Sequence, residues 1–268
     1  MLRYLRKQLT IIFVFLIILL AIGLAIYLIW RHYHPQPTCF DGIQNQGETR
    51  IDCGGPCGLC AHPMGLRIIS QDFIPTTANN FDLVAKVENP NNNWGVESVS
   101  YKFNFYNANN QSIGSKEGST YILPQETKYI VEQKIYLAEP LARIAFELER
   151  TNWQRLKDFT ELQIRVKDKN HQIINSQYRL YGVLENKSNY NLDKVEIVGL
   201  LFDDKGKIIA AGKTDIRTFL INEGRSIEIN WPYTSSDISS SEIKVYTNVF
   251  LDETFIKAHG TQEKFKEY

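Results

Sequence analysis

The chain has 268 residues, with 30 basic and 30 acidic side chains, so its formal net charge at neutral pH is zero. This balance excludes the strongly basic surface by which proteins bind nucleic acid. The length suffices for a membrane segment followed by two ordinary domains. We therefore read the elements in chain order.

Residues 10–30 form an uncharged run, TIIFVFLIILLAIGLAIYLIW. As an α-helix it would be about 31 Å long, which matches the hydrocarbon core of a bilayer. A cleaved signal peptide is the alternative, but its apolar region has only about 7–15 residues and ends in a small-x-small site. Here the run ends in the bulky residues Tyr27–Trp30, which suit a membrane interface. We expect an uncleaved transmembrane anchor.

The charges flanking this run predict its orientation. Arg3, Arg6 and Lys7 precede it, whereas Arg31 alone follows closely. The positive-inside rule then places the N-terminal tail in the cytoplasm and the rest of the chain outside the cell membrane. The external part holds 27 basic and 30 acidic residues, so it is slightly acidic. The expected partners are the membrane and a protein or envelope glycan, with no nucleic acid.

All the cysteines lie in one short segment after the run. An even number in an oxidising compartment predicts two disulfides, and three pairings are open. Gly54 and Gly55 would allow the tight turns that crowded cysteines require. Zinc held by four thiolates is an alternative, but it lacks a second CxxC pair. The four are Cys39, Cys53, Cys57 and Cys60.

The same segment carries four side-chain oxygen donors, Asp41, Asn45, Glu48 and Asp52. Hard oxygen ligands at short spacing on a glycine-containing loop are typical of calcium sites. The spacing is not that of an EF-hand, because Ile43 occupies the third loop position. The alternative is that these side chains cap turns and bind backbone amides. Calcium is thus one of two readings.

The pattern C-x-DGIxNxGExxxDCGGxCxxC, over Cys39–Cys60, resembles a small cysteine-rich segment of many bacterial and archaeal surface proteins. In those proteins it often stands beside β-sandwich modules. The resemblance implies placement outside the cytoplasm and a structural or adhesive context.

The rest of the chain reads as two copies of one module. Phe81–Glu88 and Tyr178–Glu185 both alternate apolar and polar residues, and so do Val99–Phe105 and Val195–Leu201. Period 2 marks half-buried strands. The copies are offset by 96–98 residues across the elements that can be aligned closely, which indicates an internal duplication. Six or seven short strands in about 90 residues predict an antiparallel β-sandwich for each copy.

In the second copy, Gly182–Asn186 followed by Val198–Gly206 resembles the FxLYD type of immunoglobulin-like module. Asn104–Asn107 of the first copy fits less closely, because it lacks the aspartate and the turn glycine. The resemblance implies an Ig-like or FnIII-like sandwich that is generally non-enzymatic and part of an envelope protein. One further helical turn or two is expected over Asn152–Thr160 as a connector.

The predicted fold class is therefore mainly β, with a single transmembrane helix, a small disulfide-rich segment and two tandem antiparallel β-sandwiches. The expected parts are a cytoplasmic tail (1–9), the anchor (10–30), the cysteine-rich collar (31–64), the first sandwich (65–151) and the second with a short tail (152–268).

Motifs of the common enzymes are missing from the sequence. The five histidines show neither HxxxH nor HExxH spacing, and there is no GxSxG elbow, P-loop or dinucleotide fingerprint. We expect a non-catalytic surface protein whose sandwiches bind a partner. A solute-binding or sensing ectodomain acting with a membrane partner is the alternative, and an envelope enzyme is a third, less favoured one.

Two aromatic residues are candidate partner-binding residues. Trp94 and Tyr190 end the Asn-rich loops of the two copies at an offset of 96. Exposed aromatic rings stack on sugars or anchor protein partners. The alternative is that each ring folds back and closes the end of its own sandwich.

Overall fold

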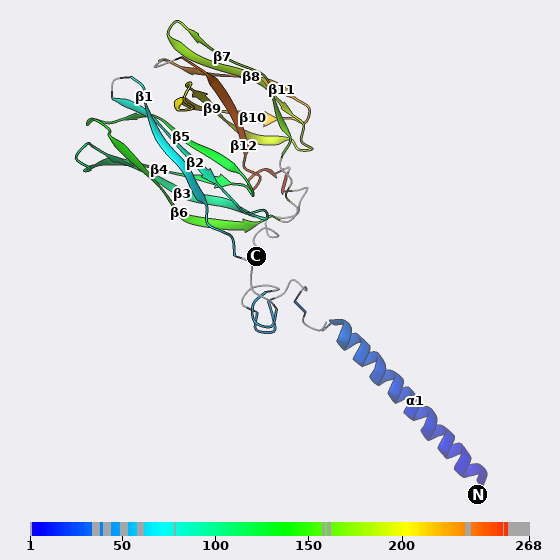
Figure 1. Ribbon diagram of the computed structural model, residues 1–268. Helices are drawn as coiled ribbons and strands as arrows, with labels where there is room; N and C mark the ends of the chain where they lie inside the picture. Colours follow the sequence, from blue (N-terminus) through cyan, green and yellow to red (C-terminus); the bar gives the residue numbers. More distant parts are fainter. Residues whose placement is uncertain are drawn as a thin grey trace. The chain divides into compact units, whose positions relative to one another are not determined.

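The computed structural model describes residues 2–33, 38–39, 44–48, 53–57, 62–77, 79–156, 159, 162–233, 237–253 and 255–256. The chain divides into two compact units, residues 1–61 and 62–268 (Figure 1).

The first unit begins with helix α1, Leu2–Tyr33, which contains the whole predicted anchor run. The stretch Phe13–Arg31 is long and apolar enough to cross a membrane, and none of it is buried. Without proline, and with Gly23 alone lacking a side chain, nothing in the run interrupts the helix. Both a membrane anchor and a signal sequence have these properties.

The second unit consists of antiparallel strands, as predicted (Figure 1). Their lengths and alternating burial follow from the period-2 patterns in the sequence. The strands are β1 (Arg67–Pro75), β2 (Asn80–Glu88), β3 (Trp94–Tyr106), β4 (Ser112–Ile122), β5 (Thr127–Tyr136), β6 (Arg143–Arg155), β7 (Ile164–Ile174), β8 (Gln177–Asn186), β9 (Leu192–Phe202), β10 (Ile208–Phe219), β11 (Gly224–Trp231) and β12 (Ser240–Thr247).

These strands form two sandwiches with the same topology. In the first, sheet β1-β2-β5 faces sheet β4-β3-β6, and in the second, sheet β7-β8-β11 faces sheet β10-β9-β12. Each strand of the first copy thus has its counterpart six strands later. The fold class predicted from the sequence is confirmed.

One local prediction is wrong. Asn152–Thr160 was expected to form a helical connector, but β6 continues to Arg155 and pairs it with Trp94 of β3. The expected domain boundary at residue 152 therefore falls inside the last strand of the first sandwich. The alternation there is masked by polar residues, because much of the end of this edge strand is exposed.

The interior of each sandwich is filled by the predicted apolar faces. Leu83, Phe103 and Phe105 are at most 2% exposed in the first. In the second sandwich, Gly199 of β9 stands at the position that Phe103 holds in β3 of the first. A Cβ atom there would lie 2.7 Å from Ile229 and 3.4 Å from the Trp231 indole. This glycine makes room for Trp231, the largest fully buried side chain.

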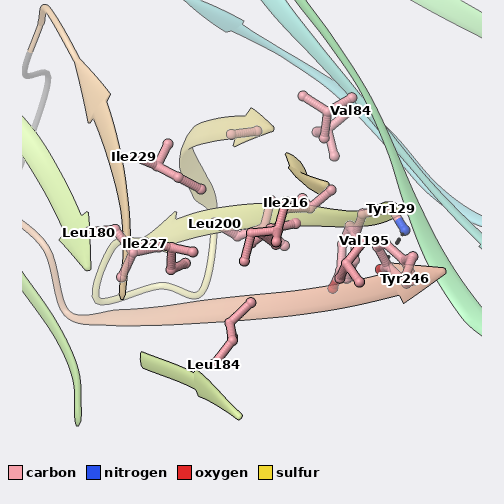
Figure 2. Close-up of a cluster of buried hydrophobic side chains, with 14 of the residues drawn as sticks. Val84, Tyr129, Leu180, Leu184, Val195, Leu200, Ile216, Ile227, Ile229 and Tyr246 are labelled. Carbon is pink, nitrogen blue, oxygen red and sulfur yellow. Dashed lines mark hydrogen bonds between the residues drawn. The ribbon is translucent and has the colours of Figure 1, made fainter. Parts of the chain in front are cut away.

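The two sandwiches pack against each other through the outer faces of two sheets, which gives four stacked layers (Figure 1). Because Gly199 faces the interior, Val198 and Leu200 face the opposite side of β9, where both are fully buried. They share one apolar cluster with Val84 of β2 and Val131 of β5. Figure 2 shows Val84 and Tyr129 of the first sandwich beside side chains of the second.

The outermost sheets carry polar residues at the equivalent positions. Where β5 has Tyr129 and Val131, the corresponding strand β11 has the exposed Ser226 and Glu228. Likewise Lys102 and Asn104 of β3 stand where β9 has Val198 and Leu200. At these positions the outer faces carry polar side chains instead of the apolar ones that join the two sandwiches.

Candidate functional site

The collar contains a disulfide between Cys39 and Cys57, whose Cα atoms are 5.3 Å apart. Cys53 is also disulfide-bonded, and no described cysteine is free. Cys60 lies outside the described residues. The expectation of disulfides is confirmed for the described cysteines, and the bond takes Cys39 and Cys57 out of any four-thiolate zinc site.

Glycines shape the collar as the sequence suggested. Gly54 and Gly55 have φ values of +80° and +56°, a region that side chains disfavour. A Cβ atom on Gly55 would also collide with the carbonyl oxygen of Gly47. The backbones of two collar turns, at Gly47 and at Gly55, are thus in direct contact.

Glu48 and Asn45 are the two predicted calcium ligands among the described residues, and they contact each other. Glu48 is 6% exposed: its Oε2 accepts a hydrogen bond from the Asn45 amide at 3.3 Å, and its Oε1 lies 3.0 Å from Cys57 Sγ. The Glu48 amide also donates to the Asn45 carbonyl at 2.8 Å. These contacts are those of a turn cap. Asp41 and Asp52 lie outside the described residues.

Potential metal-binding atoms of Cys39, Glu48 and Cys57 lie within 4.8 Å of one another. Both sulfurs belong to the disulfide, and a disulfide sulfur is not a thiolate ligand. The group therefore offers a cation only the Glu48 carboxylate. Calcium at Asp41, Asn45, Glu48 and Asp52 stays a prediction.

The candidate aromatic residues lie in equivalent loops, and both are half-buried. Tyr190 packs against the large core cluster, and its ring centroid is 5.3 Å from that of Phe255. Trp94 is the first residue of β3 and belongs to neither core cluster of the described residues. The two residues therefore differ in their packing: Tyr190 packs against the core of its sandwich, whereas Trp94 lies outside both clusters, and its role in partner binding stays a prediction.

A buried asparagine organises the loop beside Trp94. Asn89 is fully buried, and its Nδ2 donates to the carbonyls of Trp94 at 2.7 Å and Leu123 at 2.8 Å. Its Oδ1 accepts from the amide and the side chain of Asn91 at 3.1 and 2.8 Å. All its hydrogen-bonding capacity is used inside the protein.

The second copy repeats this arrangement. Asn186 is fully buried, and its Nδ2 donates to Tyr190 at 2.8 Å and Phe219 at 3.0 Å. Its Oδ1 accepts from the amide and the hydroxyl of Ser188. The Asn-rich loops are thus structural corners, a role that the sequence analysis missed although the matching spacing was visible.

A tight turn next to each corner is duplicated as well. Glu126 accepts a hydrogen bond from the Leu123 amide at 2.8 Å, and Glu223 accepts one from the Leu220 amide at 2.7 Å. Each turn includes a residue with φ near +60° just before the glutamate. The backbone carbonyls of Glu126 and Glu223 accept hydrogen bonds from the backbone amides of Asn89 and Asn186, respectively.

The interface between the sandwiches also contains specific polar contacts. Tyr246 Oη accepts a hydrogen bond from the Tyr129 amide at 3.0 Å. Tyr233 Oη donates to Asp82 at 2.9 Å, and burial raises the pKa of this carboxyl. Because hydrogen bonds are directional, these contacts define how the two packed faces are aligned more strictly than apolar packing alone would.

Lys128 is the most deeply buried charge at this interface, at 1% exposure. Its Nζ lies 3.4 Å from the ring centroid of Tyr121, 4.8 Å from that of Tyr246 and 3.9 Å from Glu196 Oε2. Burial lowers the pKa of Lys128, and the carboxylates of Glu126 and Glu196 oppose that shift.

No protein-family model and no curated protein matches the chain. Among solved structures, a red sea bream transglutaminase matches 68% of this chain and 31% of its own length, at 11% identity and a TM-score of 0.24. The calcium binding domain CBD12 of CALX1.1 matches over 60% of this chain and 75% of its own length, at 11% identity and a TM-score of 0.19. The CBM22-1-CBM22-2 tandem domain of Paenibacillus barcinonensis Xyn10C matches over 68% of this chain and 84% of its own length, at 10% identity and a TM-score of 0.13. The first match spans less than a third of the transglutaminase, and scores this low support no functional inference.

Proposed function

We propose that this protein is a non-catalytic, membrane-anchored surface protein that holds a double β-sandwich outside the cell to bind a protein or an envelope glycan. The N-terminal helix would be a single-pass anchor with its basic end in the cytoplasm. The Ig-like modules would form the recognition part.

The observation that carries this proposal is the contrast between the two exposed surfaces. Helix α1 presents unburied apolar residues throughout Phe13–Arg31, and apolar surface of that extent is stable in lipid. The double sandwich instead turns polar faces outward on both sides of its stack. A lipid-soluble end and a water-soluble end on one chain are what an anchored ectodomain requires.

The packing of the sandwiches supports a recognition role. A continuous apolar cluster and cross-interface hydrogen bonds join them, so loops at one end keep a constant spacing. Rigid presentation lowers the entropy lost on binding.

Protease accessibility tests the proposal. Adding protease to intact cells (or to spheroplasts where an outer membrane is present) should digest the full-length chain after residue 31 and leave the N-terminal tail with the anchor. Permeabilised cells serve as the control in which both sides are accessible. Protection of the C-terminal part in intact cells, or its release as a soluble fragment beginning after a cleaved leader, would refute the anchored topology.

A further inference from the structure

A cavity of about 420 Å³ opens along one side of the interface between the sandwiches. Strands β3, β4 and β5 line it from the first sandwich, and β9 and β10 from the second. Three lysines and two acidic residues belong to its lining, together with several hydroxyl donors. These residues are Lys128, Lys194, Lys213, Glu196, Asp215, Ser119, Thr120 and Thr214.

Lys128 is the unusual member of this lining. Its Nζ is buried and donates no hydrogen bond to any described residue. An ammonium group that loses its water without gaining acceptor oxygens is unfavourable. The faces of Tyr121 and Tyr246 attract the charge but accept no conventional hydrogen bond.

The duplication supplies an internal comparison for Lys128. Arg225 occupies the equivalent position: it pairs with Leu184 of β8, as Lys128 pairs with Val87 of β2. The Arg225 guanidinium binds Glu223 at 2.8 Å and the carbonyls of Arg217 and Thr218 at 3.0 Å each. The second copy thus satisfies its cation internally, and the first copy does not.

Among the residues that line the cavity, the three lysines outnumber the two carboxylates, those of Glu196 and Asp215. Glu196 lies 3.9 Å from Lys128, and Asp215 pairs with Arg217 at 3.5 Å. Glu132 is shared between Lys116 at 3.9 Å and Lys213 at 3.6 Å, and it also accepts from Tyr101 at 2.6 Å. Lys116 and Lys213 thus share the single carboxylate of Glu132, and Lys194 is a further basic residue of the lining.

We propose that this cavity is a binding site for a small oxyanion, a carboxylate or a phosphate, with Lys128 as its buried anchoring donor. The ligand oxygens would complete the hydrogen bonds that Lys128 lacks, and Ser119, Thr120 and Lys213 would bind its outer side. Because both sandwiches line the cavity, the ligand would also strengthen the interface. The inference goes beyond the proposed surface role and does not depend on membrane anchoring.

The test uses the full chain in detergent micelles, with inorganic phosphate and citrate titrated separately by calorimetry. We expect at least one of them to bind with a Kd of about 1 mM or tighter and to raise the melting temperature. The two arms distinguish a phosphate ligand from a carboxylate ligand. Choline chloride at matched ionic strength controls for general salt effects.

Lys128→Met is the diagnostic variant, and Lys205→Met, in an exposed turn, is the matched control. Methionine fills the same space without a buried charge, so the first variant should fold. It should lose at least tenfold in affinity, whereas the control should bind like the wild type. Failure of both anions to bind, or equal binding by Lys128→Met, would overturn the proposal.

Discussion

Asn89 and Asn186 stand 97 residues apart and occupy the same position in the two sandwiches, each fully buried and each tying two loops through its Nδ2. In both copies one bond goes to the carbonyl of an aromatic residue that ends the Asn-rich loop. The asparagine side chain is suited to this position because it carries two donors and an acceptor on a short stem. The corner is therefore the most closely duplicated structural device of the chain.

Replacing either asparagine should destabilise its sandwich. In Asn89→Ala the buried carbonyls of Trp94 and Leu123 lose their donor, and we expect a loss of about 2–4 kcal/mol of unfolding free energy. Asn186→Ala should cost a similar amount. Urea denaturation measures both, with the exposed Asn93→Ala as the control. A loss below about 0.5 kcal/mol would contradict the corner role.

Trp94 and Tyr190 should respond differently to truncation. Tyr190→Ala removes packing against Phe255 and should cost about 2 kcal/mol of stability. Trp94→Ala should leave the melting temperature nearly unchanged and weaken partner binding by about 2 kcal/mol or more. Thermal denaturation and crosslinking on intact cells provide the two readouts. A large fall in the melting temperature for Trp94→Ala would make it a structural plug and remove it as a binding residue.

The face-to-face packing predicts a strong contrast between Val84 and Tyr181, which hold equivalent positions in the two copies. Val84 is 1% exposed at the interface, whereas Tyr181 is half-buried on the polar outer sheet. Val84→Lys buries a charge between apolar faces and should cost more than about 2 kcal/mol. Tyr181→Lys should stay within about 0.5 kcal/mol of the wild type.

X-ray scattering complements this pair of variants. Separation of the sandwiches in Val84→Lys would raise the radius of gyration, and Tyr181→Lys would leave it unchanged. Equal effects of the two substitutions on stability would argue against an apolar interface between the sandwiches.

Asp82 predicts a specific pH dependence. Desolvation raises its pKa above the ordinary 3.8, and bonds from the Lys134 amide and the Tyr233 hydroxyl oppose the shift. A raised folded pKa means that the native state binds the proton more tightly than the unfolded state. The stabilisation is therefore complete below the unfolded pKa and is lost as the pH rises through the folded pKa.

The comparison with Asp82→Asn isolates this effect, because the other titrating groups are common to both proteins. The stability of the wild type relative to Asp82→Asn should fall as the pH rises above the ordinary aspartate pKa, measured by urea denaturation at a series of pH values. A relative stability that stays constant or rises as the pH increases would show that Asp82 does not titrate as its burial demands.

The collar permits a test of its two readings. The turn-capping contacts of Glu48 predict that Glu48→Ala speeds proteolysis of the collar both with calcium and with a chelator. Asp203→Ala, in a turn of the second sandwich, controls for general effects of removing a turn carboxylate. Protection that requires calcium in the wild type and disappears in Glu48→Ala would instead make Glu48 a calcium ligand.

The sequence by itself determined the elements and their duplication. Alternation along Phe81–Glu88 and Val99–Phe105 placed strands and inner faces, because a side-chain period of 2 is a local property of the extended chain. The uncharged run marked helix α1, and the clustered cysteines marked a disulfide-bonded collar. It failed over Asn152–Arg155, where an edge strand with mostly polar residues shows no apolar alternation.

Only the tertiary structure decided how the two copies combine and which polar residues matter. Val198 and Leu200 lie on the outer face of their sandwich, so the sequence could not say that a second sandwich covers them. Asn89, Asn186 and Lys128 look like ordinary surface residues until strands distant in sequence enclose them. Burial converts each of them into a group whose hydrogen bonds must be met, and burial is set by contacts between segments that no local pattern encodes.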